Sequence, residues 1–297
     1  MNLIKKILII ITAFFIFDSV ISTALLKLSK ISQIRYSRLY YEKINADILF
    51  IGNSRAINTF YSPYFDKLSN TKSINLSYNG LTLPLINVFV NDYLNRNKAP
   101  KIIFIEVTCI TDGYFGFPNF KQYMFDSPMI KKIIKEYYPK IYYTSIISKL
   151  YLFNSEYFLR TLYYLKKQDQ NWINRYKIKE EFYNNLLKTN ENIFLLKTIE
   201  ESLMKMFIEL ITVCRQKGIT IIPVLAPILD RCRNENNIDN YISDFEKRTK
   251  LKIINLSRAI DDISMFSDTV HTNDRGAYLI AKKLIDYLNK KNDNSSF

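Results

Sequence analysis

Histidine is almost absent from this chain: His271 is the only one in 297 residues. The three cysteines, Cys109, Cys214 and Cys232, lie far apart and form neither a Cys-x-x-Cys pair nor a Cys/His cluster. With so few soft ligands we expect no zinc or other metal site and no bound cofactor. Cys214 and Cys232 could form a disulfide, but we expect free, buried thiols.

A glycine-rich loop and a basic cluster are also missing. The turn after the first apolar run of the chain's body reads "GNSR" (52–55), which lacks the glycines of a phosphate-binding loop. The net charge is +14, yet no arginine-rich block or nucleic-acid motif accompanies it, so we expect no nucleic-acid partner. Two interpretations of the charge stay open: attraction to an anionic lipid or glycan, or a lysine-rich composition without electrostatic purpose.

Apolar and aromatic residues are plentiful. Hydrophobic residues make up 48% and aromatic residues 14% of the chain, which is typical of a folded protein and not of a disordered one. A chain of this length can bury a large core, and we expect one domain with an insertion.

The longest apolar run, "ILIIITAFFIFDSVISTALL" (7–26), lies near the N-terminus. Its twenty residues, at about 1.5 Å rise each, match a hydrocarbon core of roughly 30 Å. Asp18 costs about 3 kcal/mol at the centre of such a helix, which the apolar neighbours can offset. No small-x-small cleavage site follows, so we predict a retained single-pass membrane anchor over residues 1–30, with a buried soluble helix as the alternative. Basic residues flank the run on both sides, so charge does not decide its orientation.

Five short runs further along are nearly continuous in β-branched and apolar residues, as buried parallel strands are. They are "DILFIG" (47–52), "SINLSY" (73–78), "KIIFIEV" (101–107), "ITIIPVLAP" (219–227) and "KIINLS" (252–257). Helical patterns cover residues 83–97, 198–218, 236–250 and 274–290. The alternation predicts an α/β fold: a three-layer α/β/α, doubly wound parallel sheet of about five strands, of the flavodoxin-like kind. We assign residues 31–109 and 196–291 to this domain, and residues 292–297 to a polar tail.

An aromatic-rich segment, residues 110–195, interrupts the alternation after the third predicted strand. It shows no strand–helix rhythm and holds Trp172, the only tryptophan, so we predict a mostly helical insertion beside the active edge. Its rings could form a platform for substrate, or they could build the insertion's own core. Both interpretations stay open.

Ser54 follows the first predicted strand directly, and His271 lies in the loop after the last one. Ligands of such folds bind beyond the carboxyl ends of the strands, so both residues are expected at that edge. A serine hydroxyl needs a base, and histidine, with a reference pKa of about 6.5, is suited to the task. Asp268, three residues before His271, can orient the imidazole. Each feature is common alone, but together they fall where a catalytic triad requires them.

Three blocks of the sequence also carry a family resemblance. "DILFIGNSR" (47–55), "INLSYNG" (74–80) and "DTVHTNDRGAYLIAKKL" (268–284) resemble the first, second and last blocks of the SGNH (GDSL-like) serine hydrolases. An N-terminal membrane helix followed by Gly-x-Ser-Arg is similar to membrane-anchored members of the bacterial cell envelope. The resemblance covers residues 46–108 and 219–290, and it does not cover the insertion.

The resemblance implies roles for particular residues. Ser54 would be the nucleophile, His271 the general base and Asp268 its orienter. The backbone N–H groups of Ser54 and Gly80 would form the oxyanion hole, although Gly80 could equally serve a tight turn. Asn75 is expected to hold a loop and not to touch substrate.

The third block departs from the family pattern. The family usually has Gly-x-Asn-Asp there, and its Asn side chain is the third oxyanion donor, whereas this chain reads "EVTCITDG" (106–113). Thr108, Thr111 or Asn79 could substitute, or the site could lack this donor. Arg55 could bind an anionic group of the substrate or could cap local carboxylates.

These expectations lead to two function classes. The first is a membrane-anchored, extracytoplasmic serine esterase or O-acyltransferase that acts on acyl esters, acetyl esters above all, of cell-surface glycans. The second is a non-catalytic glycan-binding or polysaccharide-assembly protein with the SGNH fold. The missing Asn favours the second class, while the retained Ser54, Asp268 and His271 favour the first.

Overall fold

The computed structural model describes residues 2–186 and 193–293, and its contacts divide these into two compact units. The sheet unit comprises Asn45–Phe89, Lys98–Gly113 and Gln170–Phe297, and the helical unit comprises Met1–Ile44, Val90–Asn97 and Tyr114–Asp169. This division differs from the predicted one. Residues 31–44 and 90–97 join the helical segment, whereas residues 170–186 and 193–195 join the sheet. Residues 187–192 of the predicted insertion and 294–297 of the predicted tail lie outside the described residues.

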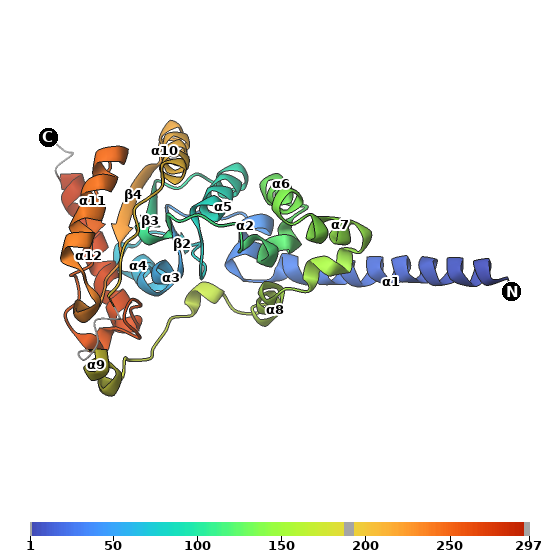
Figure 1. Ribbon diagram of the computed structural model, residues 1–297, viewed down its shortest axis with the longest axis horizontal. Coiled ribbons are helices and arrows are strands. Elements are labelled where there is room, and N and C mark those ends of the chain that lie inside the picture. The colour runs from blue at the N-terminus through green and yellow to red at the C-terminus, as the bar shows by residue number, and fades with distance from the viewer. Residues whose placement is uncertain (1, 187–192, 294–297) are drawn as a thin grey trace. The chain divides into compact units, whose positions relative to one another are not determined.

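The sheet unit is built on one five-stranded sheet in the order β2-β1-β3-β4-β5, in which every neighbouring pair is parallel. Strands β2, β3 and β4 are labelled in Figure 1. The strand order reverses between β1 and β3, so the sheet is doubly wound, as the sequence predicts. All five strands lie inside the predicted runs. Their bounds are β1 (Ile48–Ile51), β2 (Ser73–Asn75), β3 (Ile102–Glu106), β4 (Thr220–Leu225) and β5 (Ile254–Asn255).

Burial explains the apolar composition of the strands. Both faces of the sheet are covered, so consecutive residues of β1 are buried instead of every second one. Phe50 of β1 stacks on Phe104 of β3 with ring centroids 5.2 Å apart. Side chains of this size bury 150–250 Å² each, and such ring pairs dominate core energetics.

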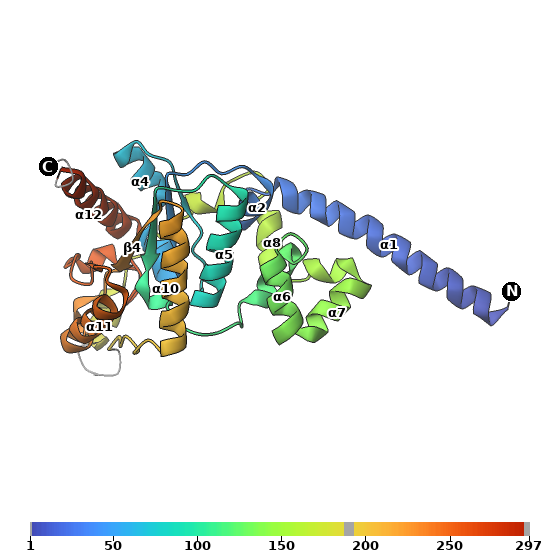
Figure 2. The same cartoon turned by 90° about the horizontal axis from the view of Figure 1, so that it is seen from above.

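Helices cover the two faces of the sheet (Figure 2). On one face α12 packs against α3 and α4, and on the other α10 packs against β4 and contacts α11. Residues 83–97 and the other predicted helical patterns form helices close to the predicted bounds. The helices of this unit are α3 (Ser54–Thr59), α4 (Ser62–Ser69), α5 (Leu83–Arg96, which ends in the helical unit), α9 (Glu180–Leu186), α10 (Glu201–Gln216), α11 (Glu235–Thr249) and α12 (Asp274–Asp293), with 3-10 turns η1 (Val107–Cys109), η6 (Asp230–Cys232) and η7 (Ile263–Met265).

The helical unit has an aromatic core. Tyr36, Phe120 and Tyr157 are fully buried, and the ring centroid of Tyr36 lies 4.9 Å from that of Phe120 and 5.6 Å from that of Tyr157. These rings therefore build the core of the helical unit and do not form a platform for substrate. The elements are α1 (Leu3–Ile31), α2 (Arg35–Tyr41), η2 (Phe117–Tyr123), α6 (Pro128–Tyr137), α7 (Pro139–Ile147), η3 (Lys149–Phe153) and α8 (Glu156–Tyr163), with η4 (Asp169–Asn171) at the boundary.

The first helix of this unit, α1, is the one described helix that is long and apolar enough to cross a membrane. Its large apolar side chains from Leu3 to Val20 are exposed, so it is not the core helix of a soluble domain. A signal sequence meets the same criterion of length and composition. Asp18 on this helix is buried: its carboxylate accepts hydrogen bonds from the Ser148 hydroxyl and from the backbone N–H groups of Lys149 (2.9 Å) and Leu150 (3.1 Å). These hydrogen-bond donors, more than the apolar neighbours, offset the free-energy cost of burying the Asp18 carboxylate.

Candidate active site

Ser54 is placed by a tight strand-to-helix turn. It is the first residue of α3, immediately beyond β1, and the Asn53 side chain caps the helix by accepting the Arg55 N–H (2.9 Å). Gly52 is required in this turn, because a Cβ there would lie 2.7 Å from the Cβ of Ala56 and 2.8 Å from that of Glu106. The glycine lets the helix start close against β3, and this fixes the direction of the serine.

The loop after β5 brings His271 to Ser54. His271 Nε2 lies 2.8 Å from Ser54 Oγ, across 217 positions of sequence. Two further bonds fix the loop: Thr272 donates to the backbone oxygen of Asn58 on α3 (2.6 Å), and the Ser267 N–H donates to the His271 carbonyl (2.9 Å). The predicted convergence of the two loops is therefore present.

Asp268 completes the arrangement from within the same loop. Its Oδ2 lies 2.7 Å from His271 Nδ1, while Oδ1 accepts the backbone N–H groups of Val270 and His271, each at 2.9 Å. Partial burial works to raise the pKa of Asp268, but the hydrogen bonds from the His271 side chain and the two N–H groups outweigh it and hold that pKa below its usual value. The carboxylate stays ionised and keeps the proton of the imidazole on Nδ1, which leaves Nε2 free to accept the serine proton.

Two N–H groups suit the predicted oxyanion hole. The Ser54 N–H is the first of α3 and binds no acceptor among the described residues. Gly80 has a positive φ of 67° in the turn closed by the Leu81 N–H and the Tyr78 carbonyl (3.1 Å), so the turn itself needs a glycine there. Within the described chain no acceptor takes the Gly80 N–H either. Its part in an oxyanion hole stays a prediction, as does substrate binding by the exposed Asn79.

Thr108 has other partners than a substrate. Its hydroxyl and its backbone N–H (3.0 Å) both donate to Glu106 Oε2, and the hydroxyl accepts the Asn53 side-chain amide (2.9 Å). A hydroxyl has one proton to donate, so Thr108 cannot serve as an oxyanion donor while it binds Glu106. Thr108 and Glu106 of the third block instead orient Asn53, the residue that caps α3.

Arg55 points into the protein and not towards solvent. It is 3% exposed, and its Nη2 donates to the carbonyls of Ala226 (2.6 Å) and Pro227 (3.0 Å) just beyond β4. Its Nε lies 3.8 Å from Oε1 of Glu106, which is fully buried. Burial lowers the pKa of Arg55, and the charges of Glu106 and Asp268 oppose this shift. Of the two predicted roles, the geometry favours pairing with local carboxylates.

Other predictions have clear outcomes. The Asn75 side chain donates to the Phe60 carbonyl (2.6 Å) and accepts the Ser77 N–H (2.8 Å), so it holds a loop as predicted. All three cysteines are free and buried, also as predicted. The described residues hold no group of three or more His, Cys, Asp or Glu side chains placed to bind a metal ion.

The chain was compared with family models, curated proteins and solved structures, and neither a family model nor a curated protein matches it. A protein assigned to the G-D-S-L lipolytic family of Desulfitobacterium hafniense DCB-2 is 10% identical over 82% of this chain and 99% of its own, with a TM-score of 0.41. An acetyl xylan esterase is 13% identical over 81% and 98%, with a TM-score of 0.39. A GDSL-like lipase of Bacteroides thetaiotaomicron VPI-5482 is 11% identical over 81% and 88%, with a TM-score of 0.37. Likeness at this level carries no argument about activity, which has to rest on the site itself.

The doubly wound strand order, the serine after β1 and the Asp-x-x-His loop after β5 occur together in this chain. The chain resembles the SGNH hydrolases. It has the serine and Asp-x-x-His blocks of that resemblance, and in its third block Thr108 binds Glu106.

Sequence reasoning missed the residues behind the SGNH-like triad. Glu106, Asn53, Asn58 and Thr272 all hold the two loops in place. Glu106 alone had a detectable signal: it is the one acid in the apolar strand "KIIFIEV", and a buried carboxylate needs partners.

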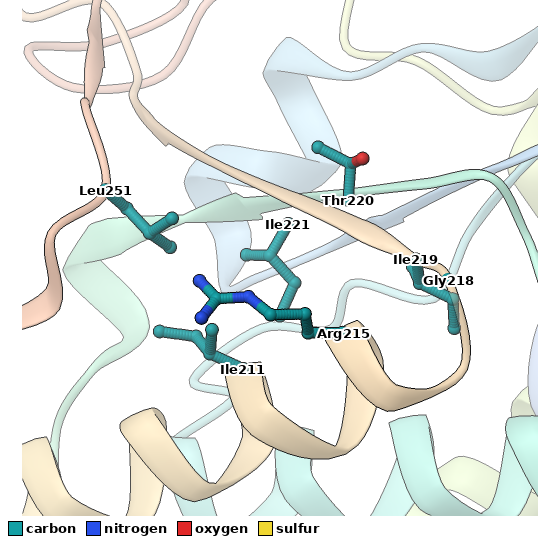
Figure 3. Close-up of a pocket in the computed structure, with 7 residues that line it drawn as sticks. All are labelled: Ile211, Arg215, Gly218, Ile219, Thr220, Ile221 and Leu251. Atoms are coloured by element: carbon teal, nitrogen blue, oxygen red, sulfur yellow. The ribbon is translucent and has the colours of Figure 1, made fainter.

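The sheet unit also contains the hollow drawn in Figure 3. Its volume is about 240 Å³, and it is lined by Arg215 of α10, Thr220 of β4 and Leu251 among others. Thr220 begins β4, whereas Ser54 follows the end of β1. In a parallel sheet these are opposite edges, so the hollow is not part of the triad's site.

Proposed function

We propose that this protein is a membrane-anchored, extracytoplasmic serine esterase or O-acyltransferase that acts on acyl esters, chiefly acetyl esters, of cell-surface glycans. One observation carries the proposal: a hydroxyl, an imidazole and a carboxylate aligned at 2.8 Å and 2.7 Å at the carboxyl edge of the sheet. The anchor is supported by the length and exposure of α1. The glycan substrate and the extracytoplasmic side rest on the resemblance to cell-envelope SGNH proteins.

The first half-reaction follows from the geometry. Ser54 Oγ attacks the ester carbonyl while His271 Nε2 takes the hydroxyl proton, and Asp268 stabilises the imidazolium that forms. The negative charge on the carbonyl oxygen is met by the N–H groups of Ser54 and Gly80. Each well-aimed donor contributes roughly 3–4 kcal/mol to lowering the barrier. The C–O bond of the ester then breaks, His271 returns its proton to the leaving oxygen, and an acyl-Ser54 remains.

The second half-reaction decides between esterase and transferase. His271 deprotonates either water or a sugar hydroxyl, that oxygen attacks the acyl carbonyl, and Ser54 regains its proton. Both outcomes use the same residues, so the identity of the acceptor depends on which hydroxyl is held at the site and on how well water is excluded.

A non-catalytic glycan-binding or assembly role is the second candidate, and one observation favours it. The chain lacks the third-block Asn of the family pattern, and the hydroxyl of Thr108, one of the residues expected to replace it, is bound to Glu106. A binding protein would not need Asp268 to hold His271 against Ser54, which is why we place this candidate second.

Labelling with a fluorophosphonate tests the nucleophile. Full-length protein in detergent micelles is expected to be labelled, Ser54→Ala is expected to lose labelling, and the matched variant Ser62→Ala should keep it. Ser62 is a buried serine of α4 whose hydroxyl has no hydrogen-bond partner in the described structure, so its loss is mild. Unlabelled wild type that is folded and turns over no ester would refute the enzyme and favour the binding protein.

The acetyl content of surface glycans separates the two enzymatic outcomes. A strain that lacks this protein should lose O-acetyl groups if the protein is a transferase and should accumulate them if it is an esterase. Unchanged acetylation, with Ser54 labelled in the wild type, would refute the glycan substrate but not the chemistry.

A further inference from the structure

The helical unit contains a groove with a volume of about 390 Å³, within the range of ligand sites. One wall comes from α1 and the other from η2, η3 and the segment that follows η2. The residues that matter are Leu26, Lys30, Gln122, Phe125, Lys149 and Leu152, and we call this set the lipid groove.

The lipid groove lies where the exposed apolar surface of α1 ends. The hydrogen bonds from Ser148 and Lys149 to Asp18 hold η3 beside α1, and the groove begins one helical turn further on, at Ser22. A span of about 20 residues crosses a bilayer's hydrocarbon core. The predicted span of residues 7–26 ends at Leu26, which lines the groove, so a membrane crossed by α1 over this span has its headgroup layer at Leu26 and Lys30.

The neighbouring surface extends the apolar band. Tyr143, Ile146 and Ile147 at the end of α7 are all at least half exposed, and Ser148, the next residue, is hydrogen-bonded to Asp18. Exposing adjacent isoleucines and an apolar helix to water is unfavourable, whereas contact with a lipid surface would bury both.

The polar lining is cationic with one unpaired acceptor. The ammonium groups of Lys30 and Lys149 form no close ion pair in the described part of the chain, although Lys30 interacts electrostatically with Asp126 and Lys149 with Asp18. The side chain of Gln122 is 2% exposed, and its Oε1 binds no donor there, although its amide donates to Thr161 (3.1 Å). The groove's acid, Asp126, accepts the hydroxyl of Tyr41 (2.7 Å), and burial raises its pKa. The site therefore offers positive charge and an acceptor above an apolar floor.

We propose that the lipid groove binds an anionic phospholipid whose headgroup carries a hydroxyl, as in phosphatidylglycerol. The phosphate would pair with Lys30 and Lys149, the headgroup hydroxyl would donate to Gln122 Oε1, and the first acyl carbons would pack on Leu26 and Leu152. The bound lipid would fix the helical unit against the membrane surface. This inference rests on the membrane anchoring proposed above and not on the acyl chemistry.

Native mass spectrometry of the full-length protein, released from a neutral maltoside detergent, tests the inference. We add phosphatidylglycerol or phosphatidylcholine and compare two double variants with equal loss of charge. Lys30→Gln with Lys149→Gln alters the groove, and Lys27→Gln with Lys140→Gln alters exposed lysines of α1 and α7 that do not line it. The groove variant should bind phosphatidylglycerol roughly tenfold more weakly than wild type, and the control should stay within about twofold.

A third variant tests the acceptor. Gln122→Leu should weaken binding of phosphatidylglycerol but not of phosphatidylmethanol, an anionic phosphodiester whose headgroup has no hydroxyl. Equal binding by the groove and control variants, or equal binding of phosphatidylcholine and phosphatidylglycerol by wild type, would overturn the proposal. Fluorophosphonate labelling of the same preparations reports on Ser54 separately, and release of the protein by an alkaline wash of membranes would refute the anchor itself.

Discussion

Replacing Arg55 by methionine should be among the most destabilising single changes in the sheet unit. The substitution keeps an unbranched apolar stem but removes the guanidinium. It leaves the fully buried Glu106 without the one cation that pairs with it among the described residues, and it leaves the carbonyls of Ala226 and Pro227 without the donor that serves both.

The expected magnitude follows from these losses. Removing one partner of a buried ion pair costs about 3–5 kcal/mol, because the remaining charge stays buried and uncompensated. The two carbonyls add to this if water cannot reach them. Against a typical total of about 5–15 kcal/mol, the variant should lose roughly a fifth or more of its free energy of unfolding. Neutralising the carboxylate as well, with Arg55→Met and Glu106→Gln together, should recover about 1–3 kcal/mol of the sum of the single effects.

Urea unfolding followed by fluorescence of Trp172 measures this change, because the only tryptophan belongs to the sheet unit. Arg258→Met is the matched control: this arginine also pairs with a glutamate, Glu235, but both side chains are exposed, so its loss should cost less than about 1 kcal/mol. If Arg55→Met costs no more than this control, or if the two single effects simply add, the argument that a buried charge pair holds the ends of β3 and β4 is refuted.

Three further predictions concern the triad and its turn. Gly52→Ala should cost roughly 1–3 kcal/mol in urea unfolding and lower the rate of Ser54 labelling, because the new Cβ meets Ala56 and Glu106 under 3 Å; an unchanged rate would contradict the tight turn. Asp268→Asn should lower kcat/KM for an aryl acetate about 10²–10⁴-fold while leaving KM nearly unchanged, since it disturbs the imidazole tautomer and not binding. The pKa of Asp268 is lowered in the folded state, so its stabilising contribution is present above the unfolded value of about 3.9 and is lost as the pH falls through the lower folded value. Wild type should therefore exceed Asp268→Asn in urea midpoint at pH 7 and lose that advantage towards pH 3, and a constant difference would be evidence against the hydrogen bonds given to this carboxylate.

Short apolar runs in the sequence were sufficient to predict most of the sheet. Each predicted strand contains an observed strand, because a strand buried on both faces has little room for polar residues and shows as a continuous run. The boundaries between the two units could not be predicted from the sequence. Residues 31–44 and 90–97 belong to the helical unit because of tertiary contacts, which local sequence patterns do not indicate.

The sequence by itself determined the α/β class, the doubly wound parallel sheet of about five strands, and the expected pairing of Ser54 with His271 and Asp268. These follow from local composition and from the rule that parallel strands end at one edge of a sheet. Only the tertiary structure decided that Thr108 binds Glu106, that Arg55 faces inward and that Asp18 caps η3. A buried charge or hydroxyl takes its role from partners tens to hundreds of residues away, and that choice is made by packing in three dimensions.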